Sequence, residues 1–470
     1  MTPLGPHEPP SGGRASRILL AALLTIVMLA VLAHPVVRPA IHQALAQAPQ
    51  GLDVTYITGP TNITRPGYYV ISTNITGVQR TGYCIGIFAS DVVLNGDGHV
   101  LSGNNWNVEI YVAPGSTNVT IEDVVVTSYY TGILVNSSGV RIVNSTLSDN
   151  GALHFYGINI TGSHDSVVNS DMSDNAVNIF VSGSNDTIAN STITNYGYGA
   201  GVVITGSYDS VIDSTVRGAD AGVVITGSHN SIVTSNVSIN WYGINITGPV
   251  NSVVNSNVSY NEYGVYVNGS DNSFVGDRFQ GDSLVLLGPY YEVVANDTVN
   301  GSPLVYLYDA SGVTVSGAGE VIAVYSRGIR VIGANVSYAT VGVQLWDVNY
   351  SVLEDVVASG DVLVGINVTG SNDTIANSTI GNDLYGIIIT GSHDVVVDLN
   401  LSHNYGYGAG VVITGSYDSV IDSTLSHNVY GYGISITGSH DSVVNSTVSD
   451  NVVGINVTGS NDTIANSTIG

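Results

Sequence analysis

The segment GINVTGSNDTIANSTIG occupies residues 365–381 and recurs without change at residues 454–470. A catalytic motif is rarely duplicated in this way, whereas a structural repeat often is. A related Gly-Ser-x-Asp/Asn pattern returns along the chain at intervals of 21–24 residues. Its glycines form two series, Gly162, Gly183, Gly206, Gly227, Gly248 and Gly269, then Gly370, Gly391, Gly415, Gly438 and Gly459. The chain is therefore built from two arrays of one short repeat.

Aligned on these glycines, the repeats predict short strands that are buried on one side. The residues four and two positions before each glycine are Ile or Val, as at Ile158 and Ile160. The residue between them varies, and this alternation is typical of a half-buried strand. It is Asn159, Phe180, Val203, Tyr266 or Ser435 in different repeats.

Two further apolar columns lie five and ten residues after each glycine, as at Val167 and Met172. A bend must separate them, because an odd spacing cannot keep both on one side of a single strand. The column at plus seven is mostly Asn, Asp or Gly, which accept left-handed backbone angles. Its Asn side chains are expected to turn inward and to hydrogen-bond with neighbouring repeats.

Three strands and three bends per repeat predict an all-β fold, a right-handed single-stranded parallel β-helix. At about 22 residues per coil, residues 50–470 give about 19 coils. The repeats divide the chain into an N-terminal cap with the first coils (47–110), a first array (111–276), irregular coils (277–364) and a second array (365–470). The second array ends without a polar cap, so we expect a longer surface protein from which further coils are missing.

Composition restricts the partners. Only 10% of the residues are charged, none is Lys, and the net charge is −26. Such a surface repels nucleic acid, which we exclude as a partner. Cys84 is the only cysteine, so disulfides do not hold the fold.

Residues 1–46 are predicted to be a targeting segment. Arg14 and Arg17 precede an apolar run at 18–33, and Ala44-Leu45-Ala46 fits a cleavage site. A signal peptide and an uncleaved membrane anchor both fit this pattern. Both place the rest of the chain outside the membrane, as a secreted or cell-surface protein.

The first coils resemble a known family. RPGYYVISTNITG (65–77) and CIGIFASDVVLNGDGHVLSG (84–103) are similar to the start of NosD-type β-helix proteins, as is the segment at 296–337. These proteins occur on archaeal and bacterial surfaces and are named after a periplasmic copper-enzyme maturation factor. The resemblance covers residues 55–470 and implies the β-helix fold. It leaves the activity open, because the same repeat occurs in carbohydrate-binding and sugar-hydrolysing proteins.

No catalytic residue is predicted. The paired Asp, Gly-His-Gly turn and Arg-Ile-Lys strand of polygalacturonase-like hydrolases are missing. Asp398 and Asp422 share the plus-seven column on neighbouring coils, at a separation that a glycosidase could use. Asp alternates there with Asn and Gly, which favours a role in the bend.

Histidines recur in two variable columns. A copper site needs clustered His, Cys or Met ligands. Because these columns also contain Asn and Tyr, we interpret their histidines as exposed bend residues. They are His164, His229, His393 and His440 in one column, with His403 and His427 in the other.

The column at plus three is a candidate metal site. It is Asp in every repeat of the second array, and Asp or Asn in the first. These residues suit Asx turns. Stacked carboxylates would also repel one another, and calcium prefers oxygen ligands. Structural calcium is therefore predicted as an alternative, at Asp373, Asp394, Asp418, Asp441 and Asp462, and no other cofactor is expected.

Asn-x-Ser/Thr sequons are abundant, which favours glycosylation of a secreted protein. The predicted acceptors are the outward residues Asn159, Asn245, Asn367 and Asn456. We expect a structural or carbohydrate-interacting β-helix whose partners are polysaccharide or other surface proteins. Alternatives are a polysaccharide-processing glycosidase or lyase, which clustered carboxylates in a cleft would favour, and a NosD-like accessory factor for a copper enzyme.

Overall fold

A computed structural model describes residues 54–76, 82–103, 108–150, 155–405, 409–428 and 431–470. These residues form 56 strands and no helix, and so include no helix that could cross a membrane. Residues 53–470 make up one compact unit. The predicted targeting segment, 1–46, lies outside the described residues.

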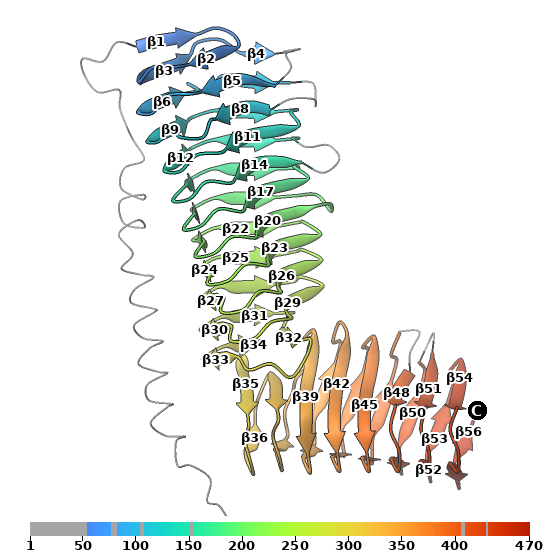
Figure 1. The fold of residues 1–470 in the computed structure, drawn as a ribbon. Coiled ribbons are helices and arrows are strands. Elements are labelled where there is room, and N and C mark those ends of the chain that lie inside the picture. Colours follow the sequence, from blue (N-terminus) through green and yellow to red (C-terminus); the bar gives the residue numbers. More distant parts are fainter. Residues whose placement is uncertain (1–53, 77–81, 104–107, 151–154, 406–408, 429–430) are drawn as a thin grey trace, which may run out of the picture. The chain divides into compact units, whose positions relative to one another are not determined.

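Most coils contain three strands that pair in parallel with the next coil (Figure 1). In one coil these are β14 (Tyr156–Ile160), β15 (Ser166–Val168) and β16 (Asp171–Ser173). They pair with β17 (Val177–Val181), β18 (Thr187–Ala189) and β19 (Thr192–Thr194). The predicted parallel β-helix is confirmed.

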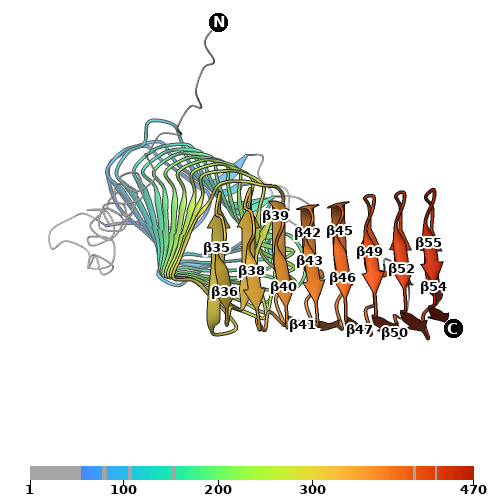
Figure 2. The same ribbon diagram turned by 90° about the horizontal axis from the view of Figure 1, so that it is seen from below.

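The coils form two stacks. The first stack has a 12-stranded sheet from β1 (Val54–Ile57) to β33 (Val293–Ala295), an 11-stranded sheet from β2 (Thr61–Ile63) to β32 (Leu284–Leu286), and a third sheet from β4 (Ile75–Thr76) to β34 (Thr298–Val299). The second stack has a sheet from β35 (Ser302–Tyr308) to β54 (Val453–Val457), an 8-stranded sheet from β36 (Thr314–Ser316) to β55 (Thr463–Ala465), and a 6-stranded sheet from β41 (Val357–Ser359) to β56 (Thr468–Ile469). The 11-stranded and 8-stranded sheets hold one strand per coil, which confirms about 19 coils. Figure 2 looks down the first stack, so that its coils superpose.

The predicted apolar columns fill the interior. Ile158, Ile160 and Val167 are at most 1% exposed. The coils approach so closely at the repeat glycines that a Cβ at Gly183 or Gly206 would overlap the carbonyl oxygen of the preceding repeat's glycine. Hence the glycine series is fixed by backbone contact between coils.

Each bend pairs an exposed left-handed residue with an inward polar one. The plus-seven residues have the predicted left-handed backbone, with φ of 48° at Asn190 and 45° at Asn377. The expectation that these side chains turn inward is wrong, because both are exposed. A left-handed residue directs its own side chain outward, so the next residue, Ser191 or Ser378, is the one that is buried.

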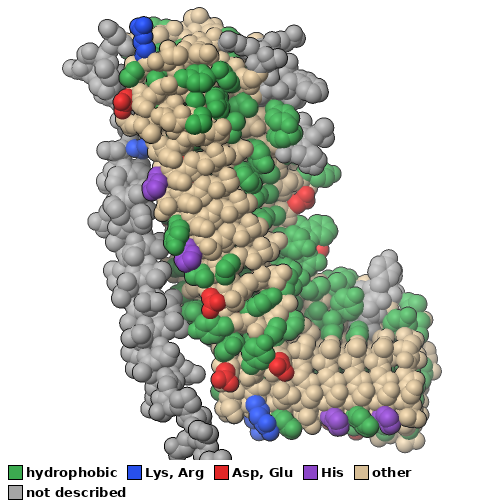
Figure 3. Space-filling model, viewed as in Figure 1, with side chains coloured by type: hydrophobic (Ala, Val, Ile, Leu, Met, Phe, Trp, Pro, Cys, Tyr) green, Lys and Arg blue, Asp and Glu red, His purple; other side chains and the backbone are tan. Residues whose placement is uncertain are grey.

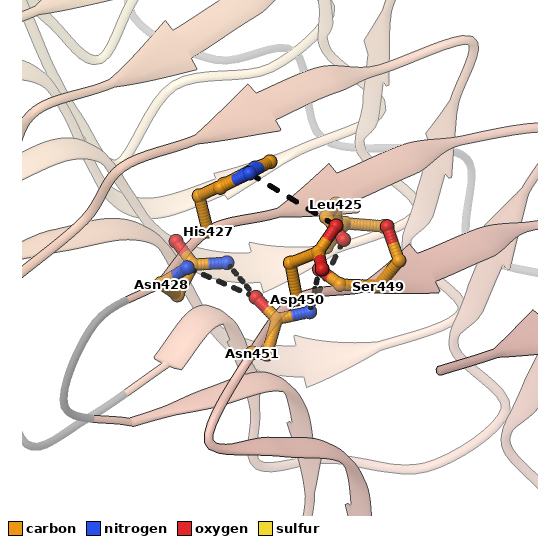
Figure 4. Close-up of polar contacts among 6 residues, drawn as sticks. All are labelled: Leu425, His427, Asn428, Ser449, Asp450 and Asn451. Atoms are coloured by element: carbon orange, nitrogen blue, oxygen red, sulfur yellow. Dashed lines mark hydrogen bonds and ion pairs between the residues drawn. The ribbon is translucent and has the colours of Figure 1, made fainter.

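The inward residues form three ladders of hydrogen bonds between coils. The backbone N–H of Val140 donates to Asp165 Oδ1 at 2.7 Å, that of Ser145 to Ser170 Oγ at 3.1 Å, and that of Asn150 to Asn175 Oδ1 at 2.9 Å. Figure 4 shows the third ladder in the second stack, where Asn428 donates both its backbone N–H and its side-chain Nδ2 to Asn451 Oδ1, at 3.0 and 2.7 Å. Each ladder thus satisfies buried backbone donors at one corner of the coil.

The two stacks join inside the predicted irregular segment, 277–364. β34 pairs with β35 in an antiparallel hairpin, and the second stack starts there. The strand that pairs with β35 on its other side, β37 (Glu320–Val324), is buried on both faces. Ile322 and Val324 belong to the core of the first stack, whereas Val321 and Ala323 belong to that of the second.

Side chains of the second stack close the edge of β32. Gln344, on β39 (Val341–Asn349), accepts the N–H of Leu286 at 3.0 Å and donates to the carbonyl oxygen of Leu284 at 2.6 Å. The buried carboxyl of Glu320 accepts the N–H of Leu284 at 3.2 Å and a hydrogen bond from Gln344 at 3.0 Å. These two side chains occupy the place of a further strand.

Replacing Gln344 should therefore destabilise the junction. Gln344→Ala leaves a buried N–H and a buried carbonyl without partners, at a cost of about 2–4 kcal/mol. Urea titration of the full chain measures this as a lower midpoint. Gln280→Ala, at an exposed position of β31 (Arg278–Gln280), is the control and should change stability by less than about 0.5 kcal/mol. Equal midpoints for the two variants would contradict the proposed closure.

Candidate functional site

The outer surface of the 11-stranded sheet is the candidate functional site. The first and fourth residues of its five-residue strands point outward and are mostly half-buried. From β5 (Tyr83–Ile87) to β29 (Tyr263–Val267) these positions carry no charged residue. We call this surface the aromatic face, and its largest side chains are Tyr83, Tyr111, Leu134, Tyr156, Phe180, Tyr242, Tyr263 and Tyr266.

Where neighbouring coils both carry a ring at these positions, the rings contact one another, because strands in register lie about 4.8 Å apart. Tyr83 stacks on Tyr111 at 5.3 Å between ring centroids, and Tyr156 lies 4.9 Å from Phe180. Figure 3 shows hydrophobic side chains in green along this side of the first stack. The coil repeat therefore produces a long, uncharged, largely apolar surface.

A second group of rings lies at the C-terminal end of the aromatic face. Tyr242 stacks on Tyr263 at 4.9 Å, and Tyr266 meets them edge-on at 5.7 and 5.9 Å. Burial raises the pKa of Tyr263 and of Tyr266. Tyr266 also packs into a small cluster with Val285 and, from the second stack, Tyr385. The aromatic face thus ends where the two stacks meet.

Flat rings with hydroxyl groups at their edges suit one kind of ligand. The ring faces can pack against the C–H groups of a sugar ring, while the hydroxyls exchange hydrogen bonds with sugar hydroxyls. A surface that repeats from coil to coil suits a polymer. Sequence analysis missed this face because it read the outward positions as merely variable; their aromatic and aliphatic character in the first array was the available signal.

Two of the predicted glycosylation acceptors lie on this face. Asn159 stands in register between Leu134 and Phe180, and Asn245 between Val224 and Tyr266. A glycan at either position would cover neighbouring rings. Asn367 and Asn456 occupy the equivalent strand position in the second stack and are half-buried. Glycosylation at all four stays a prediction.

The plus-three column forms the first ladder and is buried. In the second stack the backbone N–H of Asp373 donates to Asp394 Oδ1 at 2.8 Å, and that of Asp394 to Asp418 Oδ1 at 2.8 Å. The second oxygen of Asp373, Asp394, Asp418 and Asp441 has no hydrogen-bond partner. Burial raises the pKa of Asp373 and of Asp418 to about 7, and that of Asp394 to about 6.

A protonated Asp fits this ladder in the same way as an Asn. Asn230 and Asn251, in the same column of the first stack, accept the ladder hydrogen bond and also donate Nδ2 to the carbonyl oxygens of Gly206 and Gly227, at 3.1 and 3.0 Å. A carboxyl that keeps its proton carries no charge, and so it removes the repulsion expected between stacked carboxylates.

Calcium at Asp373, Asp394, Asp418, Asp441 and Asp462 stays a prediction. Over the described residues no three His, Cys, Asp or Glu side chains converge so as to hold a metal ion. Equal melting temperatures in calcium and in a chelator would contradict the prediction.

The histidines of both columns are exposed bend residues, as predicted. His403 stacks on His427 at 5.1 Å between ring centroids, and His427 Nε2 lies 3.9 Å from Asp450 Oδ2 (Figure 4). In the other column His393, Tyr417 and His440 stack at 4.9 and 4.8 Å.

Carboxylates gather in one hollow of the bend column. A pocket of about 290 Å³ near the first coils is lined by Asp97 and Asp123 with Asn95 and Asn144. Asp398 and Asp422 are likewise exposed bend residues, with φ of 53° and 50°. The structure thus pairs carboxylates in a pocket at positions that sequence analysis did not select.

Comparison with known proteins defines the fold. The family model described as "Right handed beta helix region" matches residues 83–238 and 311–469. No curated protein shows significant similarity to the chain.

Among solved structures, the tailspike protein of the E. coli bacteriophage HK620 is 11% identical to this chain, with a TM-score of 0.35. The match covers 85% of this chain and 71% of the tailspike chain. The A-module of Azotobacter vinelandii mannuronan C-5 epimerase AlgE6 has 12% identity and a TM-score of 0.24 over 89% and 91%. The periplasmic alginate epimerase AlgG has 11% identity and a TM-score of 0.27 over 84% and 76%.

The buried carboxyls predict that stability falls as pH rises. Burial raises the pKa of Asp186, in the first ladder, from 3.8 to about 8. The unfolded chain therefore loses this proton at a lower pH than the folded chain does. The stability from this site is complete below about pH 4 and is lost as pH rises toward about 8. Asp186→Asn needs no proton, so its free energy of unfolding should depend less on pH and should exceed that of the unaltered chain at pH 8.

Urea titrations at acidic, intermediate and alkaline pH measure this slope. The exposed Asp171→Asn is the control, because it removes the same charge outside the ladder. A slope that Asp186→Asn leaves unchanged would show that the ladder carboxyl does not hold its proton.

Proposed function

The chain belongs to the right-handed β-helix family, and from that premise we propose that it is a secreted or cell-surface carbohydrate-binding protein. We propose that a polysaccharide lies along the aromatic face. The observation that carries this proposal is the set of outward rings between Tyr83 and Tyr266, which contact one another where neighbouring coils both carry a ring, on a face without a charged residue.

Apolar surface that stays exposed along one side of a folded protein marks an interaction site more often than a structural need. Here it is narrow and repeats with the coil, and its tyrosines add hydroxyls at the ring edges. An extended chain of sugar rings matches that pattern better than a compact protein surface does, so other surface proteins are the second class of partner.

The setting outside the cell is part of the proposal. It rests on the apolar N-terminal run with its preceding arginines and on the abundance of sequons. Glycans at Asn367 and Asn456 would solubilise the second stack and leave the aromatic face of the first stack free.

A polysaccharide-processing enzyme is the second candidate. The pocket that Asp97 and Asp123 line favours it, because a glycosidase needs two carboxyl groups beside one site. Loss of sugar hydrolysis in both Asp97→Asn and Asp123→Asn would support this candidate. The copper-related role implied by the NosD resemblance has no supporting metal cluster within the described ranges.

The binding proposal predicts that ring removal weakens glycan affinity. A glycan array on the purified full chain identifies the ligand, and titration calorimetry measures its affinity. Each lost ring contact is worth about 1 kcal/mol, so Tyr263→Ala combined with Tyr266→Ala should lower the affinity more than about tenfold. Tyr208→Ala removes a ring that is 57% exposed on a bend outside the face and should leave affinity unchanged. An array without any bound glycan, or equal losses in both variants, would contradict the proposal.

A further inference from the structure

We propose that the end of the aromatic face at the junction is a subsite for a protonated amino sugar. The ligand class is then a glycan that carries free amino groups. The subsite, which we call the corner site, consists of Tyr242, Tyr263 and Tyr266 with Glu262, and Tyr405 of the second stack. The inference rests on the proposed function and specifies its ligand.

The rings of the corner site come from both stacks. Tyr242, Tyr263 and Tyr266 contact one another at 4.9–5.9 Å between centroids. Tyr405 is 45% exposed, and its hydroxyl lies 3.5 Å from the carbonyl oxygen of Val362. The pKa of Tyr263 is raised by burial and then by the charge of Glu262, and Tyr405 also contributes. Leu363, which follows Val362, packs with Tyr266 in one apolar cluster, so Tyr405 lies beside the rings at the junction.

The carboxylate of Glu262 gives the corner site its charge. Glu262 is exposed and precedes β29, where its backbone N–H donates to the carbonyl oxygen of Asn240 at 3.0 Å. In the described part of the chain the ion pairs are Arg330–Glu354 and His427–Asp450, so Glu262 has no cationic partner there. Burial, then Asp383, Glu262 and Asp361, raise the pKa of Tyr405; Asp383 and Asp361 are buried, so Glu262 is the exposed acid of this group.

This combination selects a cation that is attached to a sugar ring. Tyrosine faces attract an ammonium group through their π electrons, and a carboxylate beside them adds Coulomb attraction. The aromatic face leads sugar rings directly to this point. A polymer of acidic sugars would be repelled by Glu262 and by a chain of net charge −26.

The test compares two oligomers of equal length on the full chain, one of glucosamine and one of N-acetylglucosamine. Acetylation removes the positive charge and keeps the ring. In titration calorimetry at low salt the glucosamine oligomer should bind about tenfold more tightly, and this advantage should shrink as salt rises. Glu262→Gln should lower its affinity about threefold to tenfold and leave that of the acetylated oligomer unchanged. The control Asp171→Asn should affect neither.

The outcomes separate the two proposals. Equal affinities for both oligomers, or tighter binding of the acetylated one, would overturn the corner site while leaving carbohydrate binding intact. A glucosamine advantage that Glu262→Gln leaves unchanged would also overturn it. If no glycan of any class binds the chain, the proposed function fails together with this inference.

Discussion

The structure depends on one hydrogen bond that recurs at most corners: a backbone N–H of one coil donates to an inward side-chain oxygen of the next. At a bend the strand ladder is interrupted, and its buried N–H would otherwise lack a partner. Asp165, Ser170 and Asn175 supply the three acceptors of one coil. The left-handed residue before each acceptor turns that acceptor inward, so the bend geometry and the ladder require one another.

Much of the fold follows from the sequence because this arrangement is local and periodic. The Ile and Val columns around Ile158 and Ile160 predicted the strands, and the Asn, Asp and Gly column predicted a left-handed bend. The direction of Asn190 was predicted wrongly, since composition alone does not tell which of two adjacent polar residues faces inward. The closure of β32 by Gln344 and Glu320 could not be predicted from the sequence, because those residues are distant from β32 in sequence and occur in no repeat.

The candidate site was less predictable than the fold for a related reason. Outward positions are free of the constraints that fix the core, so their residues vary, and variation conceals a functional surface unless the chemical class of each residue is followed along the stack. Phe180 and Tyr266 were read as variable residues between buried ones. Only the register of the strands shows that such rings stand on one face, and only the junction brings Tyr385 of the second stack against Tyr266.

The ladders also have a direction, which bears on how the chain folds during synthesis. The donor always belongs to the earlier coil and the acceptor to the later one, as between Val140 and Asp165 or Asp373 and Asp394. A coil that has just left the ribosome or a translocation pore therefore waits for its successor to satisfy its three bend donors. During synthesis each emerging coil completes the preceding one, so the bend donors without a partner are confined to the newest coil.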